Sequence, residues 1–282
     1  MKRFLISLLL ILQSSLLFAQ DNWIRPNKYN YAINDYAFFQ VLKNVKSHNL
    51  MPEIDSSSIK RFTYYAMMQN VELPFSFIVK NDSIVLPSET LGTQMVVLEY
   101  QHKQKEISTI ELGKKLKENK LIKAMEDRKQ SANAQVPVKV NEIFCLKSIF
   151  QQEKKYTPDF LQKTPLALDI VPIENPYDIR NLSGYISGSE YFLQVHCKIY
   201  FKGELLKKAK VKVTRLLGNG GVEEYETRTN KEGEVTMRIT IPGEFVLSCT
   251  YLEKNSETEN SDWNSYFGSL SFGGKGNFFK KK

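Results

Sequence analysis

The chain has 282 residues, of which 42% are hydrophobic and 25% charged, and its 39 basic and 31 acidic residues give a formal net charge of +8. This length fits one large or two ordinary domains, and no stretch after residue 19 is long and apolar enough to span a bilayer. The lysine-rich runs at 103–129, 198–212 and 280–282 are interleaved with glutamate or leucine. This favours solvated faces, with attraction to anionic surfaces, over nucleic-acid binding.

The first element in chain order is a hydrophobic N-terminal segment. Two basic residues precede an apolar run from Phe4 to Phe18, and Ala19 supplies the small residue that a signal peptidase requires. Residues 1–19 are therefore predicted to be a signal peptide. The mature protein is expected to start at Gln20 and to be secreted or periplasmic and soluble. An uncleaved anchor is the alternative, which is disfavoured because nothing after Ala19 extends the apolar run to spanning length.

Residues 20–155 are predicted to form a β-rich N-terminal domain. Segments rich in β-branched and aromatic residues lie between residues 59 and 107 and are typical of strands. An alternating pattern from Val136 to Phe150 predicts a further strand.

A helical insert is predicted within this domain at residues 109–131. The segment is rich in lysine, glutamate and leucine and contains no proline, which favours helix. Its apolar residues form two separate i, i+4 pairs: Leu112 with Leu116, and Leu121 with Met125. Because the two pairs do not form one continuous stripe, we expect two short helices with a break near Asn119.

Residues 156–184 are predicted to be a linker between two domains. Pro158, Pro165 and Pro172 favour an extended, irregular segment. At the other end of the chain, residues 273–282 are expected to form a frayed tail.

Residues 185–272 are predicted to form a C-terminal β-sandwich of immunoglobulin-like type. Alternating strands are separated by glycine-containing turns, and residues 217–221 and 230–234 are both typical of hairpins. The predicted fold class is therefore mainly β, with two β-sandwich-like domains and a short helical insert.

Three cysteines follow the predicted signal peptide, at Cys145, Cys197 and Cys249. Their spacing matches no CxxC-type metal site, and an odd number in an exported chain leaves at least one of them without an internal partner. Each lies in an apolar alternating run, which favours buried free thiols. The alternative is a disulfide between Cys197 and Cys249, because both lie in predicted strands of the C-terminal domain.

No catalytic constellation is evident, and the protein is predicted not to be an enzyme. Nucleophile elbows, P-loops and dinucleotide fingerprints are absent from the sequence. The three histidines have no partner at metal-ligand spacing. We expect His102 to be exposed and His196 to be a hydrogen-bonded strand residue.

The closing segment, Asp262 to Phe272, places aromatic side chains beside an acid and small residues. The favoured interpretation is a final strand whose aromatic residues pack on a core. The alternative is a ligand- or partner-contacting surface, for which Trp23, Trp263 and Tyr266 are the candidate residues.

Six segments together resemble one known family. They are DNWIRP (21–26), ISTIELGKKLKENKL (107–121), LALDIVPIENPYDI (166–179), FKGELLKKAKVKV (201–213), TNKEGEVTMRITIPGEFVLS (229–248) and DWNSYFGSLSF (262–272). In this combination and order they resemble the domain of unknown function 4198, which is grouped with NikM-like extracytoplasmic proteins of nickel and cobalt uptake. The resemblance covers nearly the whole mature chain. It implies two β-rich domains, the second resembling a transthyretin-like or carboxypeptidase-regulatory-like sandwich.

The resemblance also implies a metal role, from which this chain departs at two positions. Family members commonly carry a histidine before the N-terminal aspartate and another in the strand after the Pro-Gly turn. Gln20 stands at the first position and Thr250 or Tyr251 at the second. Asp21 and Asp262 remain as candidate metal ligands, and carboxylates without imidazoles are poor ligands for nickel. We therefore expect no cofactor, and metal binding that is weak or absent.

Two functions from different classes are expected. The first is an exported, non-enzymatic binding accessory in the uptake of nickel, cobalt or another solute, with a membrane transporter or outer-membrane receptor as partner. The alternative is a structural or interaction module of the cell envelope that docks a membrane or polymer partner. Nucleic acid is not an expected partner of either.

The first testable prediction concerns the start of the mature chain. We expect exported protein to begin at Gln20, because Ala19 ends a run with the length and flanks of a cleaved signal peptide. N-terminal sequencing or intact mass of exported protein measures this. A full-length chain retained in the inner membrane would contradict it.

Overall fold

The computed structural model describes residues 22–43, 45, 49–50, 54–75, 78–79, 83–87, 90–102, 104–130, 136–178, 184–187, 190–217, 219–241, 243–256 and 261–274. The predicted signal peptide, Gln20, Asp21 and residues 275–282 lie outside this part of the chain. No helix in the described part is long and apolar enough to cross a membrane.

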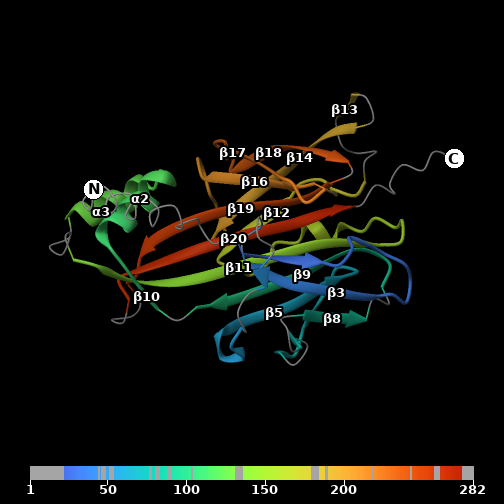
Figure 1. The fold of residues 1–282 in the computed structure, drawn as a ribbon, viewed down its shortest axis with the longest axis horizontal. Helices are drawn as coiled ribbons and strands as arrows, with labels where there is room; N and C mark the ends of the chain where they lie inside the picture. The colour runs from blue at the N-terminus through green and yellow to red at the C-terminus, as the bar shows by residue number, and fades with distance from the viewer. Residues whose placement is uncertain are drawn as a thin grey trace, which may run out of the picture.

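Three β-sheets make up the fold (Figure 1). The central sheet has the order β17 (Val222–Arg228), β16 (Lys210–Leu216), β19 (Gly243–Lys254), β20 (Trp263–Gly274), β11 (Val138–Gln152), β9 (Gly92–Gln101), β5 (Ile59–Ala66) and β6 (Gln69–Glu72), with β10 (Lys105–Ile107) and β2 (Asn30–Tyr31) also paired to β11. The second sheet, the β3 sheet, has the order β1 (Asn22–Pro26), β3 (Tyr36–Lys43), β8 (Ser83–Pro87) and β7 (Ile78–Val79), with β4 (Asn49–Leu50) beside β3. The third, the β14 sheet, has the order β12 (Leu168–Pro172), β14 (Glu190–Phe201) and β13 (Gly184–Ser187), with β15 (Glu204–Leu205) and β18 (Glu234–Ile241) beside β14.

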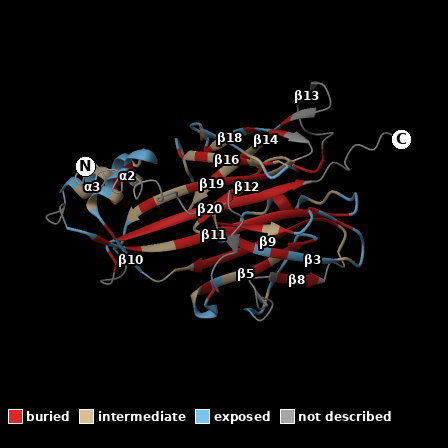
Figure 2. Ribbon diagram, viewed as in Figure 1, coloured by how far each residue is buried: buried red, intermediate tan, exposed pale blue. Residues whose placement is uncertain are grey.

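The two smaller sheets cover opposite faces of the central sheet. Successive side chains of a strand point to opposite faces. On β11, Cys145 and Ile149 lie in the core shared with the β14 sheet, whereas Phe144 and Phe150 lie in the core shared with the β3 sheet. β11 and β20 are accordingly buried along most of their length (Figure 2). The chain is mainly β with sandwich-like packing, which confirms the predicted fold class.

The central sheet runs through both predicted domains. β20 pairs in parallel with β11 from Val140 opposite Trp263 to Ser148 opposite Ser271, and on its other side it pairs antiparallel with β19. The last described strand therefore joins the strands of the first half of the chain to those of the second. The boundaries at 20–155 and 185–272 stay a prediction about independent folding units, and the shared sheet is the reason to test them.

The predicted linker at 156–184 is not an irregular connection. It contains the 3-10 turn η4 (Pro158–Leu161) and β12, all five residues of which are buried. β12 pairs antiparallel with β14, from Leu168 opposite Phe201 to Pro172 opposite Cys197. The prolines misled the prediction because they flank or end the strand, where the missing N–H interrupts no ladder.

One of the two predicted hairpins is wrong. Residues 217–221 do connect an antiparallel pair, β16 and β17, with Gly220 at φ 84° in the turn. Residues 230–234 also form a turn, in which the N–H of Gly233 donates to Asn230 O at 3.3 Å. That turn, however, leads from β17 in the central sheet to β18 in the β14 sheet. The sequence of a tight turn predicts that the chain changes direction, but it does not predict which strand the next strand pairs with.

The helical insert forms as two short helices. α2 (Thr109–Glu118) is N-capped by Ser108 Oγ, which accepts from the N–H of Glu111 at 3.1 Å, and α3 (Ile122–Gln130) follows. Asn119 ends α2 and Lys120 has a φ of 52°, so the predicted break near Asn119 is confirmed. The inward faces of the helices pack on one end of the central sheet, in a cluster of Leu112, Leu116, Ala124, Val138, Val140, Leu252 and Trp263.

Gly268 allows β12 to approach the central sheet closely. It lies on β20, in register between Cys145 of β11 and Cys249 of β19. A Cβ atom at this position would lie 2.9 Å from Leu168 Cγ and 3.2 Å from Leu168 O. Leu168 is fully buried, so the layers fit only where this side chain is absent.

A matched pair of glycine substitutions tests this packing. We expect Gly268→Ala to lower the free energy of unfolding by about 1–3 kcal/mol, because β12 must shift to admit the methyl group. Gly113→Ala places the same methyl group on α2 with no other atom within 4 Å. This substitution should raise the free energy of unfolding by about 1 kcal/mol, because alanine favours helix over glycine. Urea unfolding of both variants measures the difference, and effects of equal sign would contradict the proposed fit.

Candidate functional site

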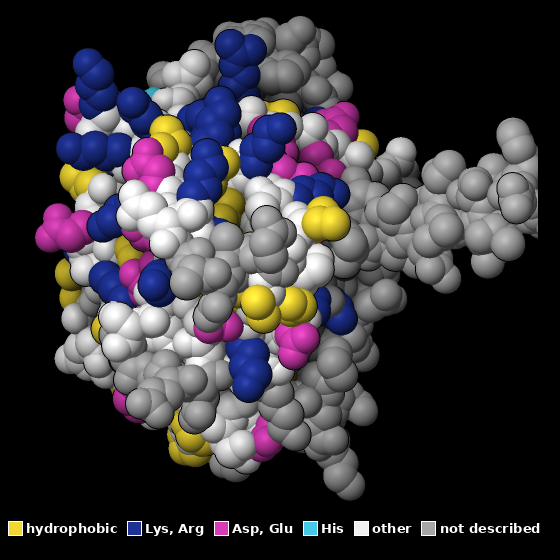
Figure 3. Space-filling view, turned by 90° about the vertical axis from the view of Figure 1, so that its left-hand side faces the viewer, with side chains coloured by type: hydrophobic (Ala, Val, Ile, Leu, Met, Phe, Trp, Pro, Cys, Tyr) yellow, Lys and Arg dark blue, Asp and Glu magenta, His cyan; other side chains and the backbone are white. Residues whose placement is uncertain are grey.

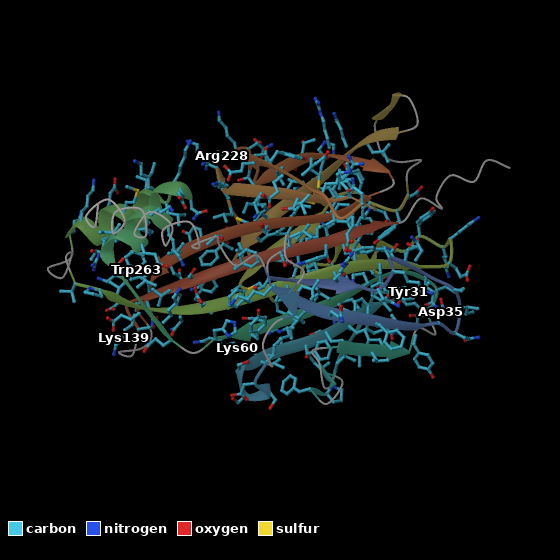
Figure 4. The ribbon with its side chains drawn as sticks, in the orientation of Figure 1. Tyr31, Asp35, Lys60, Lys139, Arg228 and Trp263 are labelled. Atoms are coloured by element: carbon cyan, nitrogen blue, oxygen red, sulfur yellow. The ribbon has the colours of Figure 1, made fainter. Side chains whose placement is uncertain are left out.

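The aromatic candidates for ligand contact are core residues. Trp23 is 0% exposed, Trp263 2% and Tyr266 5%. Trp263 packs beneath α2 and α3 (Figure 4), and the hydroxyl of Tyr266 donates to Glu253 Oε1 at 2.9 Å. The favoured prediction of core packing is confirmed, and these three side chains leave little of their surface exposed for a ligand.

Asp262, a candidate metal ligand, is used by the backbone. Its Oδ2 accepts from the N–H of Lys139 at 2.8 Å, and its own N–H donates to Lys139 O at 2.8 Å. These two bonds join the start of β20 to the start of β11. The other predicted ligand, Asp21, lies outside the described residues.

The three cysteines are free and buried in one core cluster. The alternative of a Cys197–Cys249 disulfide is therefore wrong, and the prediction of buried free thiols is confirmed. Burial raises the pKa of Cys145 and of Cys249 to about 12, and it also raises the pKa of Cys197. Thiols with such a pKa are poor nucleophiles and poor metal ligands.

The described histidines are both committed to local contacts. His196 Nδ1 lies 2.8 Å from Glu174 Oε1, and the backbone N–H of His196 donates to Glu174 Oε2 at 2.9 Å. These contacts are as predicted for a hydrogen-bonded strand residue. His102 is half-buried against Tyr100 and Phe144, so its predicted exposure is wrong. Burial lowers the pKa of His102. No cluster of three or more His, Cys, Asp or Glu side chains suited to a metal ion occurs among the described residues.

The candidate surface is the outer face of α2 and α3, which we name the helical end. Ile110 is 83% exposed and Ile122 is 67% exposed, each near the start of its helix. Val136, which leads into β11, is 54% exposed. Single exposed apolar residues are ordinary, but these three belong to one short stretch of chain.

Lysines surround the exposed isoleucines. On α2, Ile110, Lys114 and Lys117 share the outer face at i, i+4 and i+7, while Leu112 and Leu116 face the core. Residues 109–130 carry seven basic and four acidic residues, a net charge of +3. Figure 3 views this end of the molecule and shows Lys and Arg side chains gathered on its upper half, with hydrophobic side chains between them.

Four of these lysines are not neutralised locally. Within the described part of the chain, no acidic group lies within 4.0 Å of the amino groups of Lys117, Lys120, Lys123 or Lys129. Two of the four acidic side chains on these helices pair with other lysines: Glu111 lies 3.8 Å from Lys115, and Glu118 lies 3.8 Å from Lys114. The helical end therefore presents unpaired positive charge together with aliphatic side chains.

The exposed isoleucines of this surface were not predicted from the sequence, where the lysine run at 103–129 indicates only a solvated face. The available signal was that Ile110 and Ile122 lie outside both inward i, i+4 pairs, so a helical projection directs them away from the core.

Comparison with known proteins identifies the family. Residues 19–253 match the family model of DUF4198, a domain of unknown function, which confirms the resemblance found in the sequence. No curated protein matches the chain. Among solved structures, the D0–D1 domain of Intimin is 9% identical and aligns over 89% of this chain and 97% of that one, and its TM-score of 0.21 is too low to support an argument. Because the match spans most of its length, the chain belongs to the DUF4198 family.

Proposed function

We propose that the protein is an exported, non-enzymatic module of the cell envelope whose helical end docks on an anionic membrane surface. The observation that carries the proposal is the exposure of Ile110 and Ile122 among lysines that have no acidic partner within the described residues. Its export follows from the predicted signal peptide at residues 1–19. The proposal develops the alternative function expected from the sequence.

The chemistry of the helical end matches a lipid headgroup layer. Each lysine near an anionic surface contributes about 1 kcal/mol, so four unpaired lysines supply about 4 kcal/mol. Burying one isoleucine side chain contributes about 2 kcal/mol more. Costs of orientation reduce the total. The remainder suits reversible attachment rather than permanent insertion.

The rigid support beneath the helices suits a docking role. α2 and α3 are held to the central sheet through Trp263, Val138 and Val140, which are all buried. The outer face is thus presented by packed helices, and little ordering is required on contact.

The family's grouping with nickel and cobalt uptake remains a prediction. The candidate ligands that the structure describes do not fit a nickel site: Asp262 is bound to the backbone of Lys139, and the imidazole of His196 pairs with Glu174. A transporter or outer-membrane receptor as partner is compatible with membrane docking. It would place the helical end beside such a partner at the bilayer.

Vesicle flotation tests the docking proposal. We expect the mature protein to bind vesicles containing phosphatidylglycerol and not vesicles of phosphatidylcholine alone. Replacing Lys117, Lys123 and Lys129 with glutamine should weaken partitioning by about 3 kcal/mol, or roughly 100-fold. Salt at about 1 M should act in the same direction, because the Debye length falls to about 3 Å.

A charge-matched variant is the control. Lys60 on β5 and Lys207 and Lys231 in turns are exposed outside α2 and α3, and replacing all three with glutamine removes the same net charge. The control should bind nearly as the unmodified protein does. Equal loss in both variants would show a general charge effect, and binding that is indifferent to lipid charge would overturn the proposal. Changing Ile110 and Ile122 to serine should weaken the binding that persists in salt.

A metal titration tests the uptake function. We expect nickel or cobalt to bind weakly or not at all, because the imidazoles expected from the family are replaced by Gln20 and by Thr250 or Tyr251. Isothermal titration of chelator-treated protein measures this, with untreated protein as the control. Stoichiometric binding at sub-micromolar affinity that is abolished by His196→Ala or Asp262→Ala would contradict the prediction.

A further inference from the structure

Lys147 and Asp169 form a charged pair in the core between the central sheet and the β14 sheet. Lys147 on β11 is 1% exposed and Asp169 on β12 is 3% exposed at the side chain. Lys147 Nζ contacts Asp169 Oδ1 directly and also donates to Ile170 O at 3.1 Å. The other carboxylate oxygen, Oδ2, accepts from the backbone N–H of Thr164 at 2.7 Å.

This arrangement holds the amine and the carboxyl group in the contact that a reaction between them requires. Condensation of such a pair starts from its uncharged form, an amine beside a carboxylic acid, in which the proton of the ammonium group has passed to the carboxylate. The amine nitrogen is then held beside the carboxyl carbon by packed strands on both sides, as a unimolecular reaction requires. The N–H of Thr164 already points at Oδ2, the oxygen on which negative charge develops when the amine attacks.

A third carboxyl group lies on the same face of the central sheet. β9 and β11 pair antiparallel with Met95 opposite Ile149, and the N–H of His102 donates to Glu142 O in the same register. This register sets Glu99 opposite Cys145. Lys147 is two residues further along β11, so its side chain is the next one on the same face of the sheet. Glu99 is 9% exposed, and burial raises its pKa, which suits it to pass protons between the reacting atoms.

We propose that Lys147 and Asp169 condense to an intramolecular isopeptide bond. The amine nitrogen of Lys147 attacks Asp169 Cγ, forming the C–N bond, and the Cγ–Oδ1 bond breaks. Oδ1 leaves as water with two protons, one from the carboxylic acid and one from the amine, relayed through Glu99. No oxidant, reductant or external reactant is needed.

The bond would be a covalent link between two layers of the fold. β11 belongs to the central sheet and β12 to the β14 sheet, so the amide would add a covalent link between sheets that otherwise meet through apolar contacts and hydrogen bonds such as that from Arg238 N–H to the hydroxyl of Tyr225 at 3.0 Å. The three cysteines are free and supply no such link. An amide also persists under reducing conditions, where a disulfide does not.

Intact-mass spectrometry of the purified mature protein tests the proposal. We expect a mass one water molecule below that of the linear sequence. Tryptic digestion should release a branched peptide in which residues 140–154, uncleaved after Lys147, are joined to residues 164–180. Unmodified protein at the full linear mass would overturn the proposal. So would a loss of water confined to one linear peptide, as in succinimide formation.

Variants identify the groups involved. Lys147→Arg keeps the positive charge but should restore the full linear mass, whereas Lys139→Arg, at an exposed position on the same strand, should still lose water. Asp169→Asn, if it reacts, should lose ammonia in place of water. Glu99→Gln should leave most of the protein unlinked. Complete linkage in that variant would remove Glu99 from the reaction, and linkage in Lys147→Arg would overturn the assignment. Circular dichroism of each variant checks folding, and the mass of the unmodified protein decides the case even where a variant fails to fold.

Discussion

The parallel pairing of β11 with β20 is the contact on which the rest of the structure depends. It joins residues more than a hundred positions apart, from Val140 opposite Trp263 to Ser148 opposite Ser271. β9, β5 and β6 extend the sheet on one side of this pair, and β19, β16 and β17 extend it on the other. Both outer sheets pack on the continuous surface that results. Such a distant parallel contact costs loop-closure entropy before it returns stability, so it depends on the packing of both faces.

Local signals in the sequence predict local structure well, and pairing between distant strands poorly. The break between α2 and α3 near Asn119 follows from two leucine-containing pairs on different helical faces. The turn at 217–221 follows from its glycines. The partner of β20 cannot be derived in this way, because a period of two tells which face a residue occupies and not which strand lies beside it. For the same reason the turn at 230–234 could be placed but not assigned to a sheet.

The candidate site shows the same division. For an aromatic residue such as Trp263, beside an acid and small residues, the sequence favours a buried closing strand and leaves a ligand surface as the alternative. The packing of α2 and α3 over Trp263 is a tertiary feature that the sequence does not give. From the sequence alone, Asp262 is a carboxylate that could bind a metal. The structure shows that this carboxylate accepts a hydrogen bond from the backbone N–H of Lys139. The exposure of Ile110 and Ile122 was derivable from helical spacing. That the described chain leaves this face uncovered depends on tertiary structure.

Strand β11 connects the helical end to the Lys147–Asp169 pair, because the helices pack on Val140 and Lys147 lies further along the same strand. α2 and α3 rest on Val140 and Trp263, where the described pairing of β11 with β20 begins. A load applied by a docked membrane would therefore pass along these two strands and be shared across the whole ladder. The β14 sheet lies outside that ladder and is held to it mainly by apolar packing, for which β12 must approach as closely as Gly268 permits. An amide from Lys147 to Asp169 would tie β12 to β11 at the interface that the ladder alone does not secure. This joins the two proposals in one physical requirement, that the layers stay together while one end of the protein is held.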